Sequence, residues 1–214
     1  MKKIIFTLLV FVFVFLIYFF NKSEKIYYLS IGDYLSFGIN NLNKVENNYV
    51  DNIVKKNKSN LEKYINYSSL DDYRVVDLIN DISYNKTIIF DSNHYKLQNL
   101  LVKANFITIS VGMNDLIYKS KISDELYDYS DELIVDIEKL FKEIRIYNKD
   151  KIYFLSFYNV IDNQELIDYL NKKINKICVK YNINYVDISK LDNYIINLYP
   201  TNDGYDYITN QIIH

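Results

Sequence analysis

Glycine and proline are almost absent from this sequence: its 214 residues include four glycines and one proline. Average usage is roughly 7% Gly and 5% Pro, so the chain avoids both residues nearly everywhere. All five fall in three short stretches, residues 32–38, 112–115 and 199–205. Residues kept in this way serve a backbone that needs a positive φ, a close approach or a fixed φ. Such turns commonly carry an active site on an α/β sheet, so these stretches are the candidate site.

Cysteine and histidine are also scarce, which restricts the chemistry. The single cysteine, Cys178, cannot form an internal disulfide. It lies in a helical apolar pattern, which predicts a buried packing role. His94 and His214 are the two histidines. With so few candidate ligands, we expect no metal site and no cofactor.

The sequence contains no basic stripe. It carries 25 basic and 27 acidic side chains, and three of the basic ones, Lys2, Lys3 and Lys22, precede residue 23. The rest of the chain therefore has a formal charge of about −5, which argues against a nucleic-acid partner. Half of the residues are apolar, enough for one domain with a sizeable core.

A long uncharged segment lies at the N-terminus. Residues 4–20 carry no charge and almost no polar side chain, and a helix of that length spans roughly 25 Å, the lower limit for a bilayer. Lys2 and Lys3 precede it, so the positive-inside rule places the N-terminus in the cytoplasm. We expect a single-pass anchor in the cell membrane (residues 1–22) and an extracellular domain (residues 23–214). A cleaved signal peptide is the alternative, although residues 18–22 offer no small residue before a cleavage point.

Strands and helices alternate along the rest of the chain. Apolar and β-branched runs predict five strands, at residues 25–31, 61–67, 105–111, 151–157 and 184–188. Apolar residues at three- and four-residue spacing predict helices over residues 46–58, 74–82, 94–103, 131–146, 163–181 and 204–213. Residues 83–93 fit neither pattern. The alternation predicts an α/β fold whose parallel sheet has helices on both faces and its function at the carboxyl ends of the strands.

The three glycine-containing stretches resemble sequence blocks of the SGNH (GDSL-type) hydrolases. Residues 28–38 are similar to the first block, in which a strand runs into Gly-Asp-Ser-Leu, and the matches are Gly32, Asp33, Leu35 and Gly38. Residues 107–116 are similar to the third block, and the matches are Gly112, Asn114 and Asp115. Residues 199–205 are similar to the fifth block, and the matches are Pro200, Gly204 and Tyr205.

Two further segments extend the resemblance over residues 26–214. Residues 66–73 are similar to the second block, and residues 153–159 are similar to the strand-to-turn segment of membrane-anchored bacterial members. The resemblance implies the flavodoxin-like, three-layer α/β/α fold of that family, with a mostly parallel five-stranded sheet.

The residues that such an esterase uses are replaced in this chain. The resemblance implies a nucleophilic serine where the chain has Tyr34, an aspartate at Ile196 and a histidine at Tyr199. It also implies an oxyanion-hole glycine at Asp71 or, with a shift of one residue, at Asp72. A tyrosine has a pKa of about 10 and needs a nearby base before it can attack. Ile196 can neither accept a proton nor orient a partner, and a carboxylate at Asp71 opposes a developing oxyanion.

Other side chains do not complete a substitute set. Ser36 lies at the start of a predicted helix, His94 is expected to be exposed, and His214 lies about 15 Å along a helix from the Gly204 turn. Asp33 and Asp115 are expected to cap nearby backbone N–H groups. Asn114 is either an oxyanion donor or a turn residue with an unusual φ.

The chain keeps the turns of the family's sequence blocks and lacks the reactive side chains, a combination that favours a pseudoenzyme. The first hypothesis is a membrane-anchored domain that hydrolyses no ester and binds a cell-wall glycan, a lipid or a protein through Asp33, Tyr34, Asn114 and Tyr199. Tyr73 and Tyr205 would line the same cleft, because aromatic faces with hydroxyls suit sugars and acyl chains; equally, the tyrosines simply fill the emptied site. The alternative is an active esterase, lipase or acylhydrolase with an altered site. A third hypothesis is a purely structural envelope protein.

Overall fold

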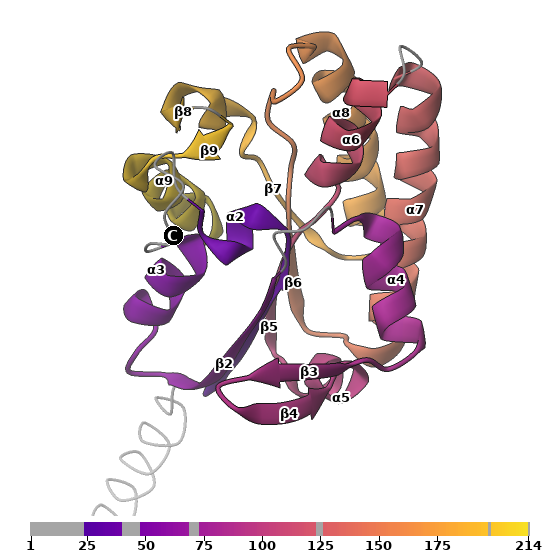
Figure 1. Cartoon of the computed structure of the whole chain (residues 1–214). Coiled ribbons are helices and arrows are strands. Elements are labelled where there is room, and N and C mark those ends of the chain that lie inside the picture. The colour runs from indigo at the N-terminus through magenta and orange to yellow at the C-terminus, as the bar shows by residue number, and fades with distance from the viewer. Residues whose placement is uncertain (1–23, 40–47, 69–72, 123–125, 197, 214) are drawn as a thin grey trace, which may run out of the picture.

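The computed structural model describes residues 24–39, 48–68, 73–122, 126–196 and 198–213. Its centre is a parallel five-stranded sheet with the order β2-β1-β5-β6-β7 (Figure 1). The strands are β1 (Ile26–Gly32), β2 (Leu61–Ser68), β5 (Phe106–Ser110), β6 (Lys151–Leu155) and β7 (Asn184–Val186). All five predicted strands are confirmed, and their order is the flavodoxin-like one.

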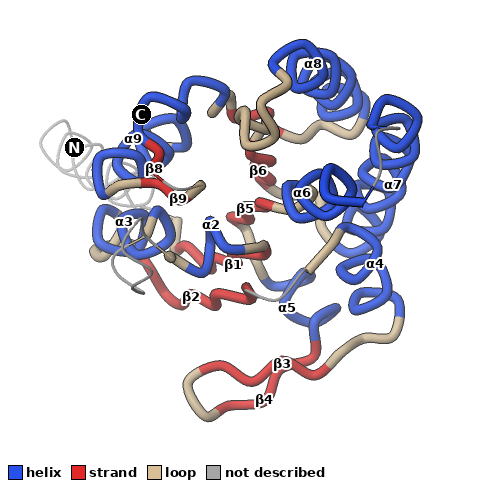
Figure 2. Tube along the Cα trace, turned by 45° about the horizontal axis from the view of Figure 1, so that its top comes forward, coloured by secondary structure: helices blue, strands red, loops and turns tan. Residues whose placement is uncertain are grey.

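Helices cover both faces of the sheet, as the alternation of elements predicted. On one face, α3 (Tyr49–Lys56) packs against α9 (Asn202–Ile212) (Figures 1 and 2). The other face carries α4 (Val75–Ser83), α5 (Leu97–Lys103) and α7 (Leu126–Tyr147), and α8 (Gln164–Lys180) lies beside α7. The result is the predicted three-layer α/β/α arrangement.

The central strands are buried on both faces, which explains their continuous apolar runs. Tyr28, Leu29 and Ile31 of β1 are fully buried, and so are Ile107 and Ile109 of β5. The polar groups enclosed with them have partners: the Tyr28 hydroxyl lies 2.8 Å from Thr108 Oγ1 of β5. The sheet is therefore a rigid platform for the loops at its edges.

The structure corrects the prediction between residues 83 and 103. β3 (Thr87–Phe90) and β4 (Asn93–Lys96) form an antiparallel hairpin, so the predicted helix over 94–103 was wrong for its first residues and begins at Leu97. The hairpin turn consists of Asp91 and Ser92, which both have positive φ, as a two-residue turn requires. Ile88 is the one buried side chain of β3, too little for a readable alternation. His94 lies on β4 and is exposed, as expected.

Several short elements were not predicted. They are α6 (Met113–Ile122), the 3₁₀ helix η1 (Ser189–Tyr194) and the small hairpin of β8 (Ile195–Ile196) and β9 (Tyr199–Pro200). The helix expected to start at Ser36 is α2 (Tyr34–Phe37), which begins two residues earlier. Among the described residues, no helix is both long and apolar enough to cross a membrane. The predicted anchor at residues 4–20, together with Asp71, Asp72 and His214, lies outside the described residues.

Candidate functional site

The candidate site lies at the carboxyl edge of the sheet, where β1 and β5 end side by side. The backbone N–H of Asp33 donates to the Ser110 carbonyl oxygen at 2.8 Å. A Cβ atom at Gly32 would lie 2.2 Å from Ser110 Oγ and 2.5 Å from the Ser110 carbonyl oxygen. Only glycine permits this close approach, so the first glycine of the chain is explained by contact between two strand ends. At Gly112 the backbone has a φ of 112°, which other residues rarely adopt.

Asp33 begins helix α2 and is fully enclosed. Its Oδ1 accepts a hydrogen bond from the backbone N–H of Leu35 at 3.2 Å, so the predicted capping function is confirmed. Burial raises the pKa of Asp33 to about 7, and the Leu35 bond and the nearby Ser110 hydroxyl offset this only in part. Asp33 Oδ2 and Ser110 Oγ are both buried without a hydrogen-bond partner among the described residues. A carboxyl group at the centre of the site is therefore poorly solvated.

Tyr34, which the resemblance aligns with the nucleophile, takes part in a chain of hydrogen bonds. Its hydroxyl lies 2.6 Å from the hydroxyl of Tyr158, which in turn donates to the carbonyl oxygen of Leu198 at 3.2 Å. Because the one proton of Tyr158 is used for Leu198, Tyr34 is the donor in the Tyr34–Tyr158 bond. The Tyr34 side chain is 5% exposed. Burial, followed by the Asp33 carboxyl, raises its pKa well above the usual value.

Ile196 and Tyr199, at the acid and base positions, lie opposite each other in the β8–β9 hairpin. The Tyr199 ring meets the Tyr34 ring edge to face, with centroids 5.7 Å apart. Ile196 is 50% exposed and contributes no polar side-chain atom. The structure thus brings the nucleophile and base positions together, as the resemblance implied, but what they share is an aromatic contact.

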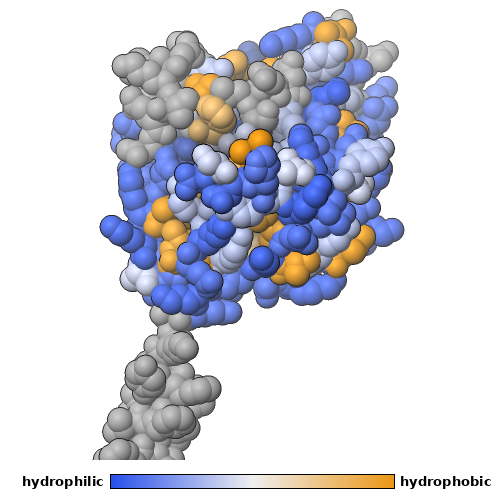
Figure 3. Space-filling view, turned by 60° about the horizontal axis from the view of Figure 1, so that its bottom comes forward, coloured by the Kyte–Doolittle hydropathy of each residue, from blue (hydrophilic) through white to orange (hydrophobic). Residues whose placement is uncertain are grey.

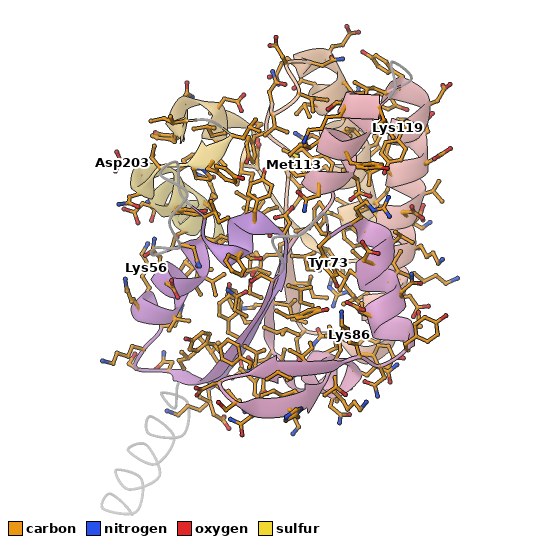
Figure 4. The ribbon with its side chains drawn as sticks, viewed as in Figure 1. Lys56, Tyr73, Lys86, Met113, Lys119 and Asp203 are labelled. Carbon is orange, nitrogen blue, oxygen red and sulfur yellow. The ribbon has the colours of Figure 1, made fainter. Side chains whose placement is uncertain are left out.

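Asn114 and Asp115 lie in the first turn of α6, directly after Met113, the first residue of that helix (Figure 4). Asn114 Nδ2 donates to the carbonyl oxygen of Tyr73 at 3.2 Å. Asp115 accepts from the Val75 backbone N–H and from the Tyr129 hydroxyl, each at 3.2 Å. Burial raises the pKa of Asp115 to about 6. Both side chains therefore fix the segment that precedes α4, which confirms the cap expected of Asp115. The expected turn conformation of Asn114 with an unusual φ was wrong, because Asn114 lies within α6 and does not have a positive φ.

The remaining candidates separate into two groups. Ser36 is buried and donates to the Asp33 carbonyl oxygen, so its hydroxyl stabilises α2. Tyr205 donates to the Ile39 carbonyl oxygen at 2.6 Å. Tyr73 instead donates to Asp81 Oδ2 at 2.7 Å, in a separate network under α4. Sequence reasoning did not single out Tyr158, although its place just after a predicted strand end was a usable signal.

Neither of two open pockets formed by the described residues includes a member of the site. One lies at the opposite edge of the sheet, and the other lies between β2 and the β3–β4 hairpin. The described part of the chain contains no group of three or more His, Cys, Asp and Glu side chains that could hold a metal ion. We call Tyr34, Tyr158, Tyr199 and Tyr205 the tyrosine cluster; the first two and Tyr205 are buried, and Tyr199 is half-buried.

Comparison with known proteins identifies the fold. No protein-family model matches the sequence, and no curated protein matches it. Among solved structures, an acetylxylan esterase of Geobacillus stearothermophilus (catalytic mutant) is 16% identical, with a TM-score of 0.65 over 89% of this chain and 94% of that one. A lipolytic protein of the G-D-S-L family from Desulfitobacterium hafniense is 15% identical, with a TM-score of 0.59 over 87% of this chain and 97% of that one. The chain has the SGNH hydrolase fold.

A third structure of the same fold is a phospholipase A1 from Streptomyces albidoflavus. It is 12% identical and has a TM-score of 0.60, with 88% of this chain and all of that chain covered. Likeness at this level of identity concerns the SGNH fold alone. Chemistry must therefore be inferred from the side chains that this chain places at the edge of the sheet.

Proposed function

We propose that this chain is a membrane-anchored, extracytoplasmic protein of SGNH fold that binds a partner and hydrolyses no ester. The observation that carries the proposal is the chain of hydrogen bonds from Tyr34 through Tyr158 to Leu198. It holds the phenol at the nucleophile position buried and neutral, with its proton already donated.

Attack by Tyr34 would require its phenolate. Burial and the neighbouring Asp33 carboxyl both oppose that ion, and the phenols of Tyr205 and Tyr199 oppose it further. The Tyr34 hydroxyl is hydrogen-bonded to Tyr158 and not to the Asp33 carboxyl, whose Oδ1 caps α2. Nucleophilic catalysis depends on a lowered barrier to deprotonation; the hydrogen bond to Tyr158 favours the phenolate, but burial and the Asp33 carboxyl outweigh it and raise the pKa of Tyr34.

The other parts of an acyl-transfer site are missing or engaged. Tyr199 and Ile196 offer no imidazole or carboxylate to relay a proton. The Asn114 amide, which would be an oxyanion donor, is bonded to the Tyr73 backbone. Among the described residues, the side-chain hydroxyl nearest to Tyr34 in the sequence is that of Ser36. It is buried and donates to the Asp33 carbonyl oxygen. These engagements support the non-hydrolytic proposal over the active esterase.

Hydrolysis of short- and medium-chain nitrophenyl esters by residues 23–214 tests this proposal. These residues include every described strand and helix. We expect turnover equal to buffer, for the natural sequence and for the matched variants Tyr34→Phe and Ser36→Ala. Turnover well above buffer that Tyr34→Phe or Ser36→Ala abolishes would establish the active alternative and identify its nucleophile.

The proposed anchor, residues 4–20, rests on the sequence alone: its length, its lack of charge and the lysines that precede it. Membrane fractions washed with alkaline carbonate retain a spanning chain and release a peripheral one. We expect the washed membranes to retain the full chain and to release a chain that begins at residue 23. Recovery of the full chain in the wash would reject the anchor without affecting the argument about the tyrosine cluster.

A further inference from the structure

The edge of the sheet opposite the tyrosine cluster has a composition of its own. We call this surface the base: it contains the amino-terminal ends of the strands, the C-terminal ends of α3, α5, α7 and α8, and the β3–β4 hairpin (Figure 1). Exposed lysines gather there, namely Lys25, Lys58, Lys103, Lys149 and Lys151, whereas Lys180 is paired with Glu138. Acidic side chains of the same edge are fewer: Glu24, Glu62, Asp91 and Asp150. The base is thus basic, although the domain as a whole is acidic.

Exposed apolar side chains occur among these lysines (Figure 3). Large apolar residues that are more than half exposed include Tyr84 after α4 (83%), Ile89 on β3 (67%), Val102 on α5 (60%), Ile146 on α7 (61%) and Val179 on α8 (76%). Single exposed apolar residues are common on any protein. A set at one end of the fold, between cationic side chains, is typical of a surface that meets a membrane.

The base also has a cleft of about 660 Å³ between the ends of β1, β5, β6 and β7. Lys149 and Lys151 line it together with Asp150, Asn105, Asn184, Phe106 and Tyr153. Cations and amide groups beside two aromatic rings suit a phosphate headgroup that is continuous with apolar chains. Glu24, the first described residue, is also part of the cleft wall.

Chain length places this surface close to the bilayer if the proposed anchor holds. Four Cα–Cα steps separate residue 20, the end of the apolar run, from Glu24, so the two lie at most roughly 15 Å apart. The part of the fold nearest the membrane is therefore the base. By contrast, the end that carries Lys119 and Asp203 is the far one (Figure 4).

We propose that the base binds the surface of the membrane that anchors the chain, and that its cleft takes an anionic phospholipid headgroup. This inference rests on the proposed anchor and deepens it by naming the partner. Each lysine near an anionic bilayer strengthens attraction roughly fivefold. The attraction weakens with salt, because the Debye length falls from roughly 10 Å at 0.1 M to 3 Å at 1 M.

The experiment uses the full chain in vesicles. The sequence contains no tryptophan, so Tyr153→Trp gives the cleft a unique fluorophore. A nitroxide attached to a lipid headgroup quenches this fluorophore when the base is docked. The nitroxide lipid is present at equal density in two kinds of vesicle, one of phosphatidylcholine alone and one with one third phosphatidylglycerol. We expect stronger quenching in the anionic vesicles and loss of the difference in 1 M salt.

Two matched double variants test the surface. Lys149→Gln with Lys151→Gln should weaken the docking equilibrium roughly 25-fold on anionic vesicles, from two lysines at about fivefold each. Lys121→Gln with Lys190→Gln removes the same charge from α6 and η1 at the far end, and should change nothing.

Three results would overturn the inference. Equal quenching in both kinds of vesicle excludes recognition of anionic lipid by the base. If chains in those vesicles also crosslink to one another through the base, its partner is a second copy of the chain. Equal effects of the two double variants exclude the cleft. Flotation with the vesicles separates the proposals: a chain that floats but shows neither difference rejects the docking alone, whereas a chain that fails to float with phosphatidylcholine rejects the anchor and the docking with it.

Discussion

Replacing Asp33 by asparagine is expected to stabilise this protein at alkaline pH. The change preserves the cap of α2, because the amide oxygen accepts from the Leu35 backbone N–H as Oδ1 does now. It also places an amide N–H where Oδ2 lies, and Oδ2 has no hydrogen-bond partner among the described residues. Asp33→Asn therefore removes a buried charge at almost constant volume.

The size of the effect follows from the pKa of Asp33. Burial raises that pKa from 3.8 to about 7, so the folded state binds a proton more tightly than the unfolded state. The free energy of unfolding then falls as pH rises from about 4 to about 7. Each pKa unit corresponds to about 1.4 kcal/mol, which sets an upper limit of about 4 kcal/mol on the cost of ionising Asp33. Asparagine does not titrate, so the variant gains this amount above pH 7 and nothing near pH 4.

Urea unfolding followed by circular dichroism at pH 4.5 and pH 8 measures the difference. With a slope of roughly 2 kcal/mol per molar urea, the midpoint of Asp33→Asn should rise by about 1–2 M at pH 8 and change little at pH 4.5. Asp187→Asn is the control, since Asp187 caps Ser189 with the same two-residue spacing at 2.9 Å but is exposed. A midpoint difference for Asp33→Asn that is the same at both pH values would refute the reasoning.

Three further predictions concern the same core. Tyr34→Phe should cost about 1 kcal/mol of unfolding free energy, the net worth of one hydrogen bond, because Tyr158 keeps its own acceptor; a cost above 3 kcal/mol in urea unfolding would contradict this. Gly32→Ala should cost about 3 kcal/mol, since the new methyl meets the Ser110 carbonyl oxygen, and an unchanged urea midpoint would disprove the contact. Cys178 is buried with a pKa raised to about 12, so it should react with a thiol reagent at pH 8 only after urea is added; rapid reaction of the native protein would show that α8 opens.

The sheet could be predicted from the sequence because its strands are buried on both faces. A run such as residues 106–110 has no polar face to confuse with a helix, and it ends at a glycine that a turn requires. The β3–β4 hairpin had no comparable signal. It contributes one buried residue from β3, so its sequence shows neither a strand nor a helix period, and the helix that follows was extended backward over it.

The site was predictable in its location but less so in its contacts. The resemblance placed Tyr34 and Tyr199 together, and their rings do meet. It gave no indication of Tyr158, because the hydrogen bond between Tyr34 and Tyr158 spans 124 residues and depends on the curvature of two loops. For Tyr73 the opposite error occurred. It was expected to line the same cleft as Tyr34 and Tyr199, but its hydroxyl donates to Asp81 instead.

The packing of Tyr34 has a consequence for protein engineering. A serine in place of Tyr34, which is 5% exposed, would leave a void where a phenol ring is packed, and it would bring no imidazole to activate the new hydroxyl. Such a chain would lose roughly 3–5 kcal/mol of stability, as expected for a large aromatic side chain cut back in a core, before it gained any catalysis. An ester-hydrolysing site could therefore be built on this chain only by several changes made together, one of which fills the void.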